Sequence, residues 1–173
     1  HEALKAGQGA GVVRELREAN STGNAPPVMQ NRRLMGGIVR RSWLDYVEAA
    51  DAFNQPGRFT ALIGFEWTAV RTGDNYHRVV VLADGADVAA KVLPFSSRIS
   101  KDPAKLWMWM ENYESSVGGR TLAIPHNPNQ SNGNAFAFED FEGARITAEY
   151  GKMRRRFEPL IEVTQIKGDS ESH

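Results

Sequence analysis

The chain has 173 residues, 41% of them hydrophobic and 24% charged, and its 21 basic side chains balance 21 acidic ones. That length and composition predict a soluble globular protein with a single domain over residues 1–173. The zero net charge gives no overall field to attract nucleic acid or a membrane surface, and the absence of cysteine excludes disulfides, thiolate metal ligands and a cysteine nucleophile.

The first quarter of the chain predicts two helices separated by a loop. Val12, Val13 and Leu16 share one face of a short amphipathic helix over residues 9–20. Residues 21–37 contain prolines and glycines without periodicity, and we interpret them as a variable loop insertion. Ser42 then has the character of a helix N-cap and predicts a helix over residues 41–54.

Two further helices and four apolar segments follow. A helix opening at Asp102-Pro103 is expected to end at Gly118, and a second one, with a basic outer face, covers residues 146–157. The four segments rich in strand formers are 59–67, 76–82, 121–126 and 160–166. Because helices alternate with apolar strands, the sequence predicts an α/β fold with a mainly parallel sheet. The first two strands are too close in sequence for a helical crossover, so they either pair antiparallel or splay apart.

Polar side chains follow these predicted strands at their ends. Glu66 ends the first strand, His126 ends the third, and His77 begins the second. The fourth strand carries Glu162, Gln165 and Lys167. Active sites of parallel α/β proteins collect beyond the carboxyl ends of the strands, and imidazole and carboxylate are ligands for divalent metals. The sequence therefore predicts that metal-competent groups converge at one edge of the sheet.

Each of these residues also has a purely structural interpretation. Glu66 could pair with an arginine such as Arg71 or Arg78, since a carboxylate in an apolar strand needs a partner. His126 could be a hydrogen-bonded core residue, and His77 a half-exposed strand residue. The basic run at 154–156 fits a solvated helix face, although it could hold a phosphate.

Several blocks of the sequence together resemble a known family. The blocks FTALIGFEWT, NYHRVVVLADGAD, LWMWME, LAIPHNPNQSNG and EPLIEVTQIKGDSESH occur in this order from Trp43 onward. They resemble the bacterial family called domain of unknown function 3604. That family in turn is similar to the PHP (polymerase and histidinol phosphatase) superfamily of metal-dependent phosphoesterases.

The resemblance implies a fold, a cofactor and a substrate class. The fold would be a partial or distorted β/α barrel of the PHP type, with zinc, manganese or iron as cofactor and a phosphate ester as the small-molecule substrate. Glu66, His77 and His126 would be metal ligands, and His1 would be a further one. The residues that would orient the substrate are Asn127, Asn129 and Lys167.

The chain departs from the superfamily pattern in ways that leave its activity open. It contains neither the HxH nor the DxH pair of that pattern. It also lacks an initiator Met and ends on the polar segment KGDSESH, which predicts a central piece of a longer PHP-like domain. We therefore hold two hypotheses, a metal-dependent hydrolase or a fragment of one, and a non-catalytic binding or structural domain. Exposed strand edges of an incomplete barrel would favour a homodimer, and the sequence does not distinguish a cytoplasmic from a periplasmic protein.

Overall fold

The computed structural model describes residues 11, 14 and 31–170, and the chain divides into two compact units, His1–Trp43 and Leu44–His173. Apart from Gly11 and Arg14, the helix predicted over 9–20 lies outside the described residues, as do residues 21–30 of the predicted loop. The prediction that the chain is one domain from the middle of a longer protein stays a prediction. Within the described part, no helix is long and apolar enough to cross a membrane.

The helix predicted to begin after Ser42 begins earlier. Helix α4 covers Arg32–Phe53, and its first turn is capped by Asn31, whose Oδ1 accepts a hydrogen bond of 3.1 Å from the Leu34 N–H. The last residues of the predicted loop therefore belong to a helix. The Gly36-Gly37 pair does not end the helix. Two glycines destabilise a helix by roughly 2 kcal/mol relative to two alanines. The helical turns on either side of the pair and the N-cap can offset this cost.

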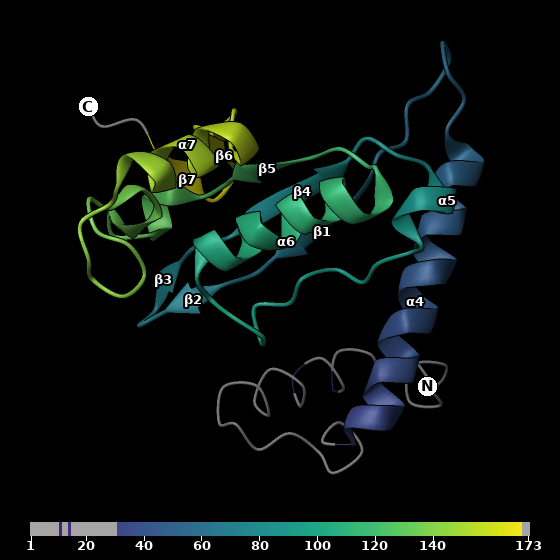
Figure 1. Ribbon diagram of the computed structural model, residues 1–173, viewed down its shortest axis with the longest axis horizontal. Coiled ribbons are helices and arrows are strands. Elements are labelled where there is room, and N and C mark those ends of the chain that lie inside the picture. Colours follow the sequence, from purple (N-terminus) through teal and green to yellow (C-terminus); the bar gives the residue numbers. More distant parts are fainter. Residues whose placement is uncertain (1–10, 12–13, 15–30, 171–173) are drawn as a thin grey trace. The chain divides into compact units, whose positions relative to one another are not determined.

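The second unit is built on one three-stranded sheet, drawn in Figure 1. Its strands are β1 (Ile63–Trp67), β4 (Arg78–Leu82) and β5 (Thr121–Pro125), in the order β1-β4-β5. Both pairs are antiparallel. The short strands β2 (Val70–Arg71) and β3 (Asp74–Asn75) form a hairpin between β1 and β4.

The expectation of a mainly parallel sheet and a partial β/α barrel is wrong, because no two strands among residues 31–170 pair in parallel. The reason lies in the connection from β4 to β5. It holds α5 (Ala86–Ala89), an extended return segment and α6 (Pro103–Val117), so the chain crosses the sheet twice rather than once. Because the second crossing brings the chain back to the end of the sheet where β4 stops, β5 begins there and runs antiparallel to β4, with Thr121 paired to Leu82.

The fourth strand is much shorter than predicted and does not join the three-stranded sheet. Residues 160–163 are outside any strand, and only β6 (Thr164–Gln165) pairs, with β7 (Gly168–Asp169), in a separate hairpin. A backbone hydrogen bond of 3.0 Å, from Glu162 N–H to the Pro125 carbonyl, attaches this segment to the end of β5. Pro159 has no N–H to donate to a ladder, which limits pairing at the start of the segment.

One face of the sheet carries the core of the second unit. Side chains alternate along each strand, so Ile63, Trp67, Val80 and Leu82 point to the same side and are at most 2% exposed. Helices α6 and α7 (Ala148–Phe157) contribute Trp107, Met110 and Phe157 to the core. The predicted helix start at Asp102-Pro103 is confirmed, since Asp102 Oδ1 accepts a hydrogen bond of 2.9 Å from Ala104 N–H.

A buried ion pair lies inside this core. The Arg78 and Glu158 side chains are each 1% exposed, with Nε and Oε1 3.0 Å apart. The same Oε1 accepts a hydrogen bond of 2.8 Å from Trp107 Nε1, and Arg154 Nε lies 3.4 Å from the second oxygen. One carboxylate therefore joins β4, α6 and α7.

This arrangement predicts a large stability loss for Glu158→Gln. The amide keeps the shape of the side chain but leaves two buried guanidinium groups without a counter-charge, which we expect to lower the free energy of unfolding by about 3–5 kcal/mol. Urea denaturation followed by tryptophan fluorescence measures it.

The matched control is Glu111→Gln. Glu111 pairs with Arg156 at 2.9 Å, but both side chains are 50% exposed, so the loss should stay below about 1 kcal/mol. Equal losses for the two variants would contradict a special role for the buried pair.

Candidate metal centre

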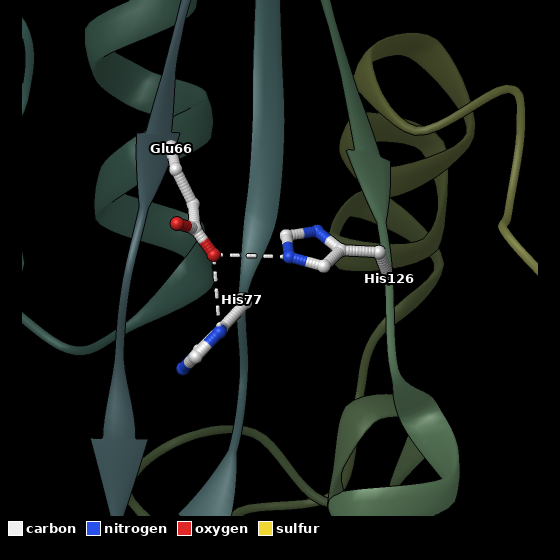
Figure 2. Close-up of side chains that lie close together, drawn as sticks. All are labelled: Glu66, His77 and His126. Carbon is white, nitrogen blue, oxygen red and sulfur yellow. Dashed lines mark hydrogen bonds and ion pairs between the residues drawn. The ribbon is translucent and has the colours of Figure 1, made fainter. Parts of the chain in front are cut away.

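Three of the predicted residues come together at one edge of the sheet. Glu66 lies on β1, while His77 and His126 stand just outside the ends of β4 and β5. Figure 2 shows the two imidazole rings directed toward one carboxylate oxygen of Glu66. His126 Nε2 lies 3.0 Å from Glu66 Oε1, and His77 Nδ1 lies 3.1 Å from the same atom.

The strand directions explain why these residues meet. β1 and β5 both run antiparallel to β4, so they run in the same direction and end at the same edge, where β4 begins. Arg78 pairs with both Trp67 and Pro125, and His77 and His126 each stand one residue further out. Because side chains alternate, Glu66, His77 and His126 all point to the face that α6 and α7 leave open.

The two histidines are more enclosed than the glutamate. The His77 and His126 side chains are 14% and 11% exposed, whereas Glu66 is 47% exposed. Burial lowers the pKa of His77 below its usual 6.5; the Glu66 carboxylate opposes this, and the charges of His126 and Lys167 add to it. A neutral imidazole has a lone pair for a metal, so this shift favours ligation over protonation.

The donor set fits a divalent cation. One ligand atom from each of the three residues lies within 4.8 Å of the other two. Ligands held about 2.0–2.2 Å from a tetrahedral zinc are roughly 3.3–3.5 Å apart, close to the two contacts that Glu66 makes. Two histidines and a glutamate are also a ligand set of catalytic zinc sites, which keep a further position for water or substrate.

Several buried polar atoms around the site lack partners. Among the described residues, His77 Nε2 and His126 Nδ1 have no hydrogen-bond partner. His77 Nδ1 is close to Glu66 but not aligned for a hydrogen bond. The amide of Asn127, which is 1% exposed, is also without a partner in this part of the chain. Unpaired buried groups cost free energy, so water or a ligand is expected to bind here.

The other predicted site residues lie in different positions. Asn127 follows His126 with a left-handed backbone, φ 51°, and its buried amide does not face solvent. Asn129 is exposed, and its backbone N–H donates a hydrogen bond of 3.2 Å to Ser170 Oγ. Lys167 is exposed at the tip of the β6–β7 hairpin, near enough for its charge to act on His77. His1 lies outside the described residues, so its ligand role stays a prediction.

The alternative partners considered for Glu66 are occupied elsewhere. Arg78 pairs with Glu158 on the covered face, and the Arg71 guanidinium lies 4.7 Å over the ring of Phe141. Sequence reasoning missed Glu158, because a glutamate that precedes a proline at a helix end carries no pattern that marks it as buried.

The chain belongs to the family described as protein of unknown function (DUF3604), whose model matches residues 1–173. No curated protein and no solved structure matches it.

The geometry predicts that Zn²⁺ or Mn²⁺ binds to the purified chain and that Glu66→Gln or His126→Ala weakens this binding by at least about tenfold, since the first change removes the negative charge of the carboxylate ligand and the second removes an imidazole ligand. Isothermal titration with each metal measures the affinity. Glu48→Gln is the control, because Glu48 is an exposed residue of α4 and should leave the affinity unchanged. Equal affinities for all variants would place any bound metal elsewhere.

Proposed function

We propose that this member of the family is a divalent-metal-dependent hydrolase that acts on phosphate esters, with Glu66, His77 and His126 as metal ligands. The observation that carries the proposal is the convergence of one carboxylate and two imidazoles, with ligand atoms all within 4.8 Å of one another. A hydrolase is favoured over a structural metal site because the described residues bring three protein ligands together, which leaves a coordination position for water or substrate, whereas structural zinc sites are closed by four ligands.

The three ligands have different parts in this proposal. The two enclosed histidines would hold the cation against the sheet, while the half-exposed Glu66 faces the side from which substrate arrives. When bound, the cation supplies Lewis-acid polarisation of the phosphoryl group and a water of lowered pKa. The backbone hydrogen bond of 3.3 Å from His126 N–H to the His77 carbonyl keeps the two ligand positions at a constant separation.

Lys167 would bind an anionic oxygen of the substrate. Its hairpin is held beside the loop that follows His126 by the hydrogen bond from Asn129 to Ser170 and by close packing of Gly168. The backbone of Gly168 has a φ of 138°, which favours glycine, and a Cβ there would require the Asn129 side chain to move. The lysine therefore stays next to the metal ligands without an ion-pair partner among the described residues.

Support for the phosphate ester comes from the similarity that we expect between this family and the PHP phosphoesterases, and from the positive charge of Lys167. The antiparallel sheet is not the barrel of that superfamily. The proposal therefore depends on the ligand set and not on the fold.

We expect the metal-loaded chain to hydrolyse p-nitrophenyl phosphate and to lose this activity on dialysis against EDTA. Mn²⁺ or Zn²⁺ should restore it. Glu66→Gln should lower kcat/KM by at least about tenfold, and Glu48→Gln should not change it. Metal binding without hydrolysis of this or other phosphate esters would instead support the second hypothesis, a non-catalytic metal-binding domain.

We expect Lys167→Gln to raise KM for the same ester by about tenfold with little change in kcat, because the lost charge-assisted hydrogen bond acts equally on bound substrate and transition state. Lys91→Gln removes another exposed lysine and serves as the control. Steady-state kinetics at constant ionic strength separates KM from kcat, and an unchanged KM would remove Lys167 from the binding site.

A further inference from the structure

A second polar cavity lies away from the candidate metal ligands. It has a volume of about 270 Å³, and none of Glu66, His77 and His126 lines it. The residues that matter for its chemistry are Arg71, Tyr76, Glu139, Asp140, Tyr150 and Arg154. They come from β2, from the link between β3 and β4, from the loop before α7 and from α7 itself.

Two arginines share one buried carboxylate beneath this cavity. Glu158 is the one carboxylate that contacts both Arg78, 3.0 Å away, and Arg154, 3.4 Å away. The Arg154 side chain is 18% exposed, so it is largely removed from water. Burial lowers the pKa of Arg154, Glu158 opposes this, and the charge of Arg78 adds to it. Arg154 therefore shares its one contacting carboxylate with Arg78, and an anion at the arginine end of the cavity would stabilise its charge.

Arg71 adds a second guanidinium to the same cavity. It is half-buried and lies against Phe141, and it makes no ion pair with a carboxylate in the part of the chain that the structure describes. The hydroxyls of Tyr76 and Tyr150 likewise have no hydrogen-bond partner among residues 31–170. Guanidinium and hydroxyl groups together are typical of sites for phosphate or carboxylate groups.

The two acidic residues limit what can bind. Asp140 Oδ1 is engaged in its own turn, where it accepts hydrogen bonds of 2.9 Å from Glu142 N–H and Ala144 N–H. Glu139 is exposed. An anionic group of a ligand is therefore favoured only beside Arg71 and Arg154. The part of the ligand that lies beside Glu139 would carry hydroxyl or amino groups.

We propose that this cavity is a binding site for a small molecule with one phosphate or carboxylate group, held by Arg71 and Arg154 together with the tyrosine hydroxyls. The site requires no metal and does not depend on the proposed hydrolase activity. The arginines of the run at 154–156 therefore have different surroundings. Arg154 lines the cavity, whereas Arg156 pairs with Glu111 and Glu114 at the surface.

Isothermal titration of the whole chain with inorganic phosphate and, separately, with acetate tests the site. EDTA is present throughout, so that no divalent cation contributes. Wild type should bind at least one of the two ions, and Arg71→Gln should weaken that binding by at least tenfold. Tyr150→Phe provides a second variant, which should weaken the binding of the same ion about threefold or more.

One control tests whether the effect is local to the cavity. Arg98→Gln changes an exposed arginine that does not line the cavity and should leave the affinity unchanged. Binding of phosphate alone or acetate alone would name the group that the cavity accepts. Failure of wild type to bind either ion, or equal binding by wild type, Arg71→Gln and Tyr150→Phe, would overturn the proposal.

Discussion

The buried carboxylate of Glu158 is the constraint on which the second unit depends. It contacts Arg78 on β4, Trp107 on α6 and Arg154 on α7, so a single side chain determines how two helices are placed on the sheet. A charge with 1% exposure is stable only if its partners are present, because desolvation of the carboxylate and of the guanidinium each costs several kcal/mol. Helix placements that separate these partners are strongly disfavoured. The pair therefore selects one packing rather than simply adding stability.

The same pair helps to position the candidate metal ligands. Arg78 is adjacent to His77, and its guanidinium also donates a hydrogen bond to the Tyr76 carbonyl. The backbone on both sides of His77 is thus held from the covered face, while the imidazole points to the open face. Glu66 and His126 arrive from β1 and β5, which flank β4 and end at the same edge. A rigid sheet edge of this kind can hold ligand atoms at 3.0 and 3.1 Å without any loop that must close first.

Features that depend on interactions between residues close together in the sequence could be predicted from the sequence. The cap at Asp102-Pro103 and the glycine that ends α6 follow from backbone chemistry within a few residues, and both are observed. The direction of β5 could not be predicted, since it depends on whether the chain crosses the sheet once or twice between Leu82 and Thr121. The grouping of Glu66, His77 and His126 was expected from parallel strand ends, yet it arises in an antiparallel sheet, because alternate strands of such a sheet also end at one edge. The burial of Glu158 could not be predicted from the sequence, because it results from tertiary packing.

The two faces of β4 therefore carry two different kinds of polar chemistry. On the open face His77 lies beside Glu66 and His126, and burial lowers the pKa of its imidazole. On the covered face Arg78 shares Glu158 with Arg154, whose guanidinium lines the same cavity as Tyr76. A cation on one face and an anion on the other would each be bound by residues within the tripeptide Tyr76-His77-Arg78 or by their direct partners. Because opposite charges on the two sides of one strand attract, binding of either ion should favour binding of the other, and by linkage the effect must be equal in both directions.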